Sequence, residues 1–252
     1  MPADLVKPRL ETRWLGRSYE WHEECGSTND LAAARAREGA PEGLVIAAEA
    51  QTRGRGRLGR SWHSPVGESL YFSILLRPTR PTSEIPPLTL LAGAAVAGAL
   101  AGLGFSPKLK WPNDVQLDGG RKVAGILTEM SSEGARASHV VVGIGLNVNA
   151  TAFPPELEGR ATSLRLARGG EILDRGAVLA AVLAAFEPLY ERFAAEGAAI
   201  ASAAWQEHAA LGARARVGAL EGLTLGVDPD GALRLRDDAG HVHRILSGEI
   251  TT

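Results

Sequence analysis

The sequence predicts an α/β (α+β) fold in two parts: a large domain of strands and helices over residues 1–210, and a small β-barrel over residues 211–252. In the first part, short apolar runs rich in β-formers alternate with longer alanine-rich runs of helical length. After Leu211 only short alternating runs occur, separated by Asp-Pro-Asp-Gly and Asp-Asp-Ala-Gly turns. The chain has 252 residues, 45% of them hydrophobic, which is enough to bury one sizeable core and a smaller neighbouring unit.

The first predicted helix begins at the segment Ser27-Thr28-Asn29-Asp30, a strong N-cap signal that precedes an alanine-rich run. These polar groups either cap the helix or hold the polar group of a ligand at its exposed N–H end, and the residues alone leave both roles open. Two apolar strands are predicted next, at 44–48 and 69–76.

The segment 88–103 is the most apolar in the chain, but three glycines interrupt it, so we expect a buried helix. The Pro-Asn-Asp sequence at 112–114 predicts a tight turn that Lys110 and Asp114 bracket. Segment 151–170 is predicted to be a loop containing proline and glycine. Further helices are predicted at 175–196 and 200–210, and further strands at 122–129, 139–149, 213–217, 223–227, 232–236 and 242–246.

The most distinctive segment, which we call the anion loop, is 54–60. It has three glycines and three arginines in seven positions, and Trp62 follows it closely. Glycine allows positive φ and close approach to a ligand, and arginine presents a planar set of donors that matches phosphate or carboxylate. Ordering about seven residues costs roughly 7–14 kcal/mol, so the loop is either partly pre-formed or closed by a ligand that makes many contacts. Disordered RNA-binding segments have similar compositions, but the strands predicted on both sides favour a cap over a small ligand.

Charge and composition argue against several classes of protein. The net charge is −2, from 27 basic and 29 acidic residues, so no general basic field attracts nucleic acid. Cys25 is the only cysteine, which excludes a disulfide framework. Residues 1–17 carry charges of both signs, and no unbroken apolar stretch approaches the length of a membrane span, so we predict a cytoplasmic protein without a membrane segment.

Common catalytic signatures are missing from the sequence. The six histidines lack the spacing of a zinc site, and neither a Gly-x-Ser-x-Gly elbow nor a P-loop occurs. Gly143 and Gly145 lie inside a predicted strand and are not a dinucleotide-binding fingerprint, but they thin the strand for a ligand or a bulge. Lys122 stands at a strand entrance, where a lysine is usually solvated. The remaining cations, with Asp114 in its turn, suit a site that neutralises negative charge.

Taken in order, these segments resemble the biotin protein ligases, also called biotin–acetyl-CoA-carboxylase ligases. The closing segment 245–250 also resembles the C-terminal cap domain of that family. The resemblance covers most of residues 25–150, and five motifs in the same order are highly specific. The matching segments are Ser27-Thr28-Asn29, Gln51, 54–60 with Trp62, 110–114, 122–127 and 143–147.

The resemblance implies a central mixed sheet with flanking helices, like the catalytic core of class II aminoacyl-tRNA synthetases, and an SH3-like C-terminal barrel. It also implies two chemical steps. The carboxylate of biotin attacks the α-phosphate of ATP, giving biotinyl-5'-AMP and pyrophosphate, and a lysine of a biotin carboxyl carrier protein then displaces AMP. Mg²⁺ would accompany ATP, with no dedicated His/Cys metal site.

The resemblance also assigns roles by position. Lys122, Arg57, Asp114 and Lys110 would be the catalytic residues, with Asp114 orienting either the carrier lysine or the metal. The residues implied to bind biotin are Ser27, Thr28, Asn29, Gln51, Arg55, Gly56, Arg57, Lys122, Gly125, Gly143 and Gly145. The residues implied to bind the nucleotide are Arg57, Arg60, Trp62, Lys110, Asn113, Lys122 and Asn147.

Two alternatives stay open at this point. Lipoate or octanoate ligases and transferases have a similar fold and also keep a lysine near the acyl group, although the full anion loop and the C-terminal barrel favour biotin. A non-catalytic nucleic-acid module is disfavoured by the slightly acidic chain. About 26 residues precede Ser27, too few for the DNA-binding domain of some relatives, so we expect no DNA binding. A homodimer is possible.

Overall fold

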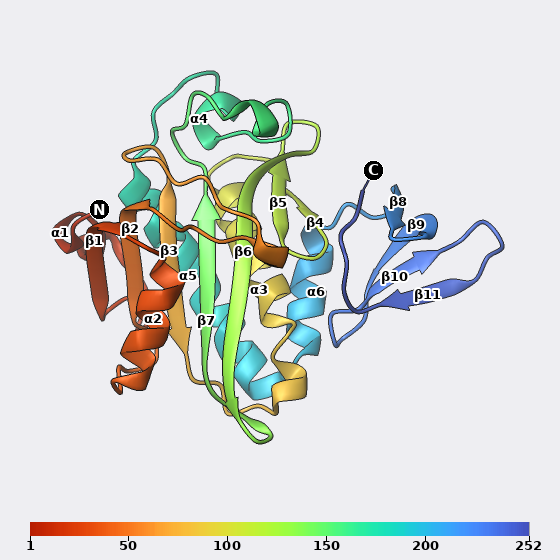
Figure 1. Ribbon diagram of the computed structural model, residues 1–252, viewed down its shortest axis with the longest axis horizontal. Helices are drawn as coiled ribbons and strands as arrows, with labels where there is room; N and C mark the ends of the chain where they lie inside the picture. The colour runs from red at the N-terminus through yellow and green to blue at the C-terminus, as the bar shows by residue number, and fades with distance from the viewer. Residues whose placement is uncertain (252) are drawn as a thin grey trace.

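The computed structural model describes residues 1–251, which form a large mixed sheet, a smaller antiparallel sheet and flanking helices (Figure 1). The large sheet has the order β1-β2-β3-β7-β6-β5-β4. Its β1 and β2 pair in parallel and the other neighbours are antiparallel, so the predicted mixed sheet is confirmed. The strands are β1 (Tyr19–Cys25), β2 (Val45–Gln51), β3 (Leu70–Leu76), β4 (Lys108–Lys110), β5 (Asp114–Leu117), β6 (Arg121–Glu133) and β7 (Arg136–Leu146).

Helices cover both faces of the large sheet (Figure 1). Helix α2 (Thr28–Arg37) lies on one face, while α3 (Leu88–Gly102), α5 (Arg175–Glu196) and α6 (Ala199–His208) pack together on the other. By length and composition, the stretch 82–102 resembles a membrane span, with mean hydropathy 1.6. However, 72% of its apolar window is buried inside the protein, as the sequence predicts for a core helix.

The period of two along β7 decides what lies on each face of the sheet. Val140, Val142 and Ile144 point into the main core with α3 and α5, whereas Val141 packs in a smaller core under α2. The next positions on the α2 side are Gly143 and Gly145. The sheet therefore has a hydrophobic face, and on the opposite face, beyond α2, β7 has two positions without side chains, against which other groups can pack.

The C-terminal part is a four-stranded antiparallel sheet in the order β11-β10-β9-β8. Each of the four predicted runs overlaps one of its strands, which are β8 (Arg214–Val217), β9 (Leu220–Val227), β10 (Leu233–Arg236) and β11 (Val242–Ile245); β9 begins three residues before its predicted run at 223–227. The sheet contacts the large domain through hydrogen bonds from Trp111 Nε1 to the Gly231 carbonyl (3.0 Å) and from Ser202 Oγ to the Asp228 carbonyl (2.8 Å).

Several elements were not predicted from the sequence. Edge strand β1 contains mostly polar and charged residues without a clear alternation, and β4 has only three residues. Strand β5 has only four residues, and they follow directly on the predicted turn at 112–114. The segment 151–170, predicted to be a loop, contains the short helix α4 (Leu164–Ala167); α1 (Ala3–Val6) is equally short. Short elements and edge strands have too little periodicity to be recognised.

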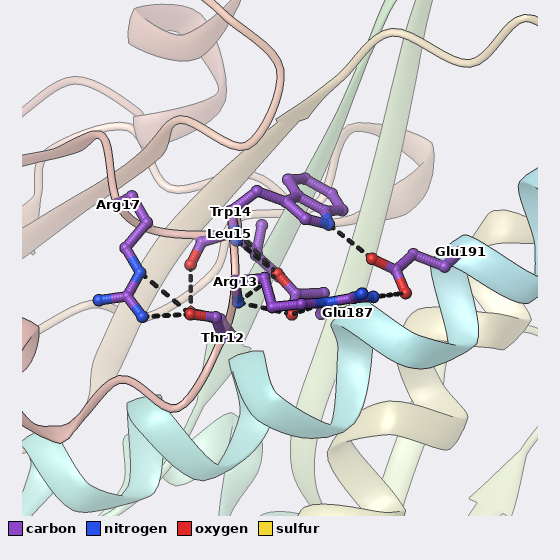
Figure 2. Close-up of polar contacts among 7 residues, drawn as sticks. All are labelled: Thr12, Arg13, Trp14, Leu15, Arg17, Glu187 and Glu191. Atoms are coloured by element: carbon purple, nitrogen blue, oxygen red, sulfur yellow. Dashed lines mark hydrogen bonds and ion pairs between the residues drawn. The ribbon is translucent and has the colours of Figure 1, made fainter.

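A buried carboxylate attaches the N-terminal segment to α5 (Figure 2). The carboxylate of Glu187 accepts hydrogen bonds from the backbone N–H groups of Arg13, Trp14 and Leu15, at 2.8 to 2.9 Å. Burial by itself raises the pKa of the Glu187 carboxyl, but the three N–H donors outweigh it, so the pKa lies below its ordinary value. Glu191, one turn later, accepts a hydrogen bond from Trp14 Nε1 at 2.9 Å.

Replacing Glu187 with glutamine is expected to lower the free energy of unfolding by about 2 kcal/mol at neutral pH, because charge-assisted hydrogen bonds become neutral ones. A lowered pKa in the folded state contributes stability above the ordinary glutamate pKa, and that contribution is lost as the pH falls through the folded value. The difference between wild type and Glu187→Gln should therefore close in acid. Urea titrations at several pH values measure it. Glu191→Gln is the matched control and should cost less, and a pH-independent difference would contradict the expectation.

Candidate active site

One pocket of 530 Å³ opens on the α2 side of the large sheet, beneath the loop that joins β2 to β3. In Figure 1 this loop crosses in front of β7 and β6. All of the residues singled out from the sequence line this pocket. They are Ser27, Thr28, Asn29, Gln51, Arg55, Gly56, Arg57, Arg60, Trp62, Lys110, Asn113, Asp114, Lys122, Gly125, Gly143, Gly145 and Asn147.

Sheet register explains why motifs far apart in the sequence meet at this pocket. Gly145 of β7 is paired with Gly125 of β6, Gly125 with Asp114 of β5, and Asp114 with Lys110 of β4. These four residues form one row across four strands. Because Cβ atoms in register lie about 5 Å apart, the row brings a cation and a carboxylate next to two positions without side chains.

One end of the pocket is a network of neutral polar groups. Gln51 Oε1 accepts a hydrogen bond from the Thr28 N–H at 2.8 Å and lies 3.2 Å from its hydroxyl. The hydroxyl of Ser73 lies 2.7 Å from Thr28 Oγ1 and 2.6 Å from Asn29 Oδ1. Ser27 occupies the N-cap position of α2 without a capping bond from its side chain. Sequence reasoning missed Ser73, although a fully buried serine within the otherwise apolar β3 is a usable signal.

A junction of charged groups connects this polar end to the anion loop. Glu129 of β6 accepts a hydrogen bond from Asn29 Nδ2 at 2.6 Å and pairs with Arg55 at 2.9 Å. Arg55 also pairs with Asp30 at 2.6 Å. The side chain predicted to contact a ligand anion is thus engaged by two carboxylates, which hold the loop against α2 and β6. The sequence analysis did not single out Glu129.

The anion loop has internal structure of its own. The Gly56 N–H donates to the Arg60 carbonyl at 2.7 Å, and the Trp62 N–H donates to the Gly54 carbonyl at 2.9 Å. Leu58 has a φ of 56°, in the left-handed region, and its side chain is exposed. Of the two possibilities left by the sequence, a loop that is partly pre-formed therefore fits this structure.

Trp62 fills the space above Gly125 and Gly145, the two positions of the row that lack side chains. A Cβ on Gly145 would lie 2.3 Å from the indole, and a Cβ on Gly125 would lie 2.8 Å from it. Lys122 Nζ lies 5.2 Å from the ring centroid, within the range of a cation–π contact. The indole Nε1 is buried and has no hydrogen-bond partner among residues 1–251. The glycines thus make room for Trp62, which leaves an unused donor in the pocket.

The other end of the pocket is rich in cations. Lys122 Nζ lies 2.5 Å from Asp114 Oδ1. Burial lowers the pKa of Lys110; nearby Asp114 opposes this effect, while Lys122 and Arg160 reinforce it. A bound anion would relieve the mutual repulsion of these cations. The arrangement suits a ligand with concentrated negative charge.

The C-terminal tail closes this end of the pocket. Arg57 Nη1 donates to the Gly248 carbonyl at 3.2 Å, and Arg60 forms an ion pair with Glu249. Glu249, with its neighbours Ile250 and Thr251, lines the pocket. The sequence indicated a C-terminal cap domain but not these contacts, which join residues about 190 positions apart.

Asn113 and Asn147 have mainly structural hydrogen bonds. Asn113 Nδ2 donates to the Ile126 carbonyl at 2.8 Å, and Asn147 Nδ2 donates to the Thr162 carbonyl at 3.0 Å. Both side chains keep their amide oxygen available to a ligand. Within residues 1–251, no group of three or more His, Cys, Asp or Glu side chains is arranged to hold a metal ion.

Comparisons with known proteins agree with this geometry. Residues 24–147 match the biotin/lipoate A/B protein ligase family. The bifunctional ligase/repressor BirA of Bacillus subtilis is 39% identical over 249 residues, covering 96% of this chain and 76% of that protein. The biotin–[acetyl-CoA-carboxylase] ligase of Mycobacterium tuberculosis is 35% identical over 255 residues, covering 95% and 91%. The biotin protein ligase of Aquifex aeolicus, solved with biotin and ATP, superposes with a TM-score of 0.79 at 32% identity, covering 93% and 98%.

These comparisons identify the mixed sheet and its pocket, which has a polar and a cationic end, as those of a ligase enzyme. Given these identities and coverages, the chain belongs to the biotin protein ligases of the biotin/lipoate A/B protein ligase family.

Proposed function

We propose that the chain activates biotin with ATP as biotinyl-5'-AMP and transfers the biotinyl group to a specific lysine of a biotin carboxyl carrier protein. The main support is that each of the family motifs singled out above contributes residues to one pocket, with a neutral polar end and a cationic end. Biotin has the matching division, with a ureido ring at one end and a carboxylate at the other.

The polar network would bind the ureido ring. Ser27, Thr28 and Gln51 offer hydroxyl and amide groups at the pocket surface, and all are at least half-buried. Asn29 already donates to Glu129 and lies close to Ser73, so its contribution is to fix the shape of this end. The unpartnered Trp62 Nε1 is a further donor that a ligand in the pocket would satisfy.

The cationic end would catalyse the first step, formation of biotinyl-5'-AMP. An oxygen of the biotin carboxylate forms a bond to the α-phosphorus of ATP, and the bond to the bridging oxygen breaks, so that pyrophosphate leaves with the electron pair. Two anions must meet in this step, and fixed cations reduce their repulsion and take up charge at the five-coordinate phosphorus. Lys122 and Arg57 would contact the reacting groups, with Lys110 on the phosphate side.

Two carboxylates line the pocket, Asp114 and Glu249, and Glu249 is paired with Arg60. Carboxylate oxygens are ligands that Mg²⁺ prefers, and Asp114 would hold the ion that accompanies ATP. The bound ion would neutralise phosphate charge. In the second step the amine of the carrier lysine attacks the carbonyl carbon of biotinyl-5'-AMP and AMP leaves with the electron pair of the anhydride bond. Asp114 would then accept a hydrogen bond from the incoming amine, and it would take the proton that the amine loses.

Several finer assignments accompany this function. The catalytic core, residues 1–210, would be like that of class II aminoacyl-tRNA synthetases, and 211–252 would be an SH3-like barrel; the pairing of Thr251 with Arg216 at the open edge of β8 supports closure of that sheet. Net charge −2 favours activity without DNA binding in the cytoplasm.

The experiment that tests the function is pyrophosphate release by purified protein with MgATP and either biotin or lipoate, followed by native mass spectrometry for retained acyl-adenylate. We expect release and a retained adenylate with biotin only. Release with lipoate alone would mean that the substrate is lipoate and not biotin, within the same family. No release with either acid would overturn the proposal and leave the anion loop as a binding surface for another ligand.

A further inference from the structure

The cations of the pocket divide into two groups by their partners. Seven Lys and Arg side chains line it, and four of them have an acidic partner: Arg55, Arg60, Arg121 and Lys122. The other three form no ion pair within residues 1–251: Arg57, Lys110 and Arg160. The family motifs account for Arg57 and Lys110. Arg160 lies outside them, in the segment that the sequence analysis treated as a loop.

Arg160 is attached by its backbone to the centre of the site. The Lys122 N–H donates to the Arg160 carbonyl at 2.8 Å, and the Thr162 N–H donates to the Lys122 carbonyl at 2.9 Å. These bonds pair the segment with the start of β6, so the Arg160 side chain lines the pocket beside Lys122. The guanidinium is exposed, makes no side-chain hydrogen bond among residues 1–251, and lies near enough to Lys110 to act on its charge.

We propose that Arg160 binds the terminal phosphates of ATP and holds pyrophosphate as it leaves. The proposal rests on the function given above and extends it to the leaving group. As the bond to the α-phosphorus breaks, negative charge grows on the departing oxygen. An unpaired guanidinium offers several donors in the planar geometry that phosphate oxygens accept.

The distribution of partners favours the terminal phosphates over the reacting carboxylate. Lys122, which lies beside Gly125, is already paired with Asp114 and is half-buried next to Trp62. Arg160 lines the pocket but is exposed, so it lies where a bound triphosphate would extend from the pocket towards solvent. Acidic side chains offset the charge of four of the seven cations. An unpaired cation at the solvent-exposed side of the pocket therefore contributes more to binding a highly charged substrate.

The test compares Arg160→Ala and Arg160→Lys with wild type in each half-reaction. Removing one charge-assisted contact should raise the KM for ATP about tenfold and weaken product inhibition by pyrophosphate to a similar extent, while the KM for biotin stays the same. Lysine should restore part of both effects. Transfer from purified biotinyl-5'-AMP to the carrier involves no pyrophosphate, and its rate should be unchanged.

Arg165→Ala is the matched control, because it removes the same charge from the same segment at a residue that does not line the pocket; it should leave both half-reactions at the wild-type rate. Wild type must form biotinyl-5'-AMP. If it does not, the proposed function itself is wrong, and not only the role of Arg160. Wild-type kinetics for ATP and pyrophosphate in Arg160→Ala would overturn the inference. Slower transfer to the carrier, with an unchanged KM for ATP, would also overturn it and assign Arg160 to carrier contact.

Discussion

Lys122→Ala is expected to abolish formation of biotinyl-5'-AMP while the protein remains folded. The lysine lies between the two reacting anions in the proposed arrangement, and removing one such fixed donor costs about a hundredfold to a thousandfold in rate. Lys122 also pairs with Asp114 and lies over the Trp62 ring, so its loss leaves an uncompensated carboxylate next to the incoming phosphates. The repulsion from that carboxylate adds to the effect. Pyrophosphate release with MgATP and biotin measures the outcome.

The structural cost of this change is expected to be small. The Lys122 side chain is 32% exposed, and an ion pair of this kind contributes at most about 1 kcal/mol to stability. Thermal melting should therefore change little. Lys108→Ala, at an exposed lysine of β4 outside the pocket, is the control and should release pyrophosphate like wild type. Normal release by a folded Lys122→Ala variant would remove Lys122 from the chemistry.

Local sequence signals were sufficient for the long elements of this fold. The predicted helix at 175–196 coincides with α5, and the apolar helix near residue 90 is α3 in the main core. Their composition determines both results, because a long run of helix formers needs no knowledge of its neighbours. Edge strand β1 shows the opposite case: its charged residues are stable in a strand only because β2 supplies the pairing.

The sequence predicted which residues line the site but not which of them contact one another. The motif residues can be read from one chain in order, but strand register decides which of them touch. Ser73 meets Asn29 across 44 residues, and Arg55 meets Glu129 across 74. No local sequence pattern predicts a contact between residues so far apart in the chain. The glycines of the site are a second example. The sequence predicted that they make room for a ligand, but the side chains of Trp62 and Asn29 occupy the space beside them.

Gly143→Ala is expected to weaken biotin binding strongly, although it removes no polar group from the pocket. A Cβ at this position would lie 2.2 Å from Asn29 Oδ1 and 2.9 Å from its Cγ. Asn29 has no free direction in which to move, because it is held by Ser73 on one side and Glu129 on the other. Overpacking of this kind costs about 2 kcal/mol, equivalent to an affinity loss of about 30-fold. Titration calorimetry with biotin alone measures it.

Gly98→Ala provides the control for adding a methyl group. Gly98 lies in α3, and no atom is within 4 Å of its added Cβ. Biotin affinity should be unchanged there, and stability should rise by up to about 1 kcal/mol because alanine favours a helix. A folded Gly143→Ala protein with wild-type affinity would show that the position of Asn29 does not matter for binding.

The route of the Gly143 effect can be isolated with a double-mutant cycle. If the methyl group acts by displacing Asn29, then Gly143→Ala should cost little further affinity in an Asn29→Ala background, where the clashing amide is gone. The two changes would then be non-additive by most of the single-variant loss. Full additivity would mean that the methyl group blocks the ligand itself, and the glycine would then be lining the cavity for biotin rather than making room for Asn29.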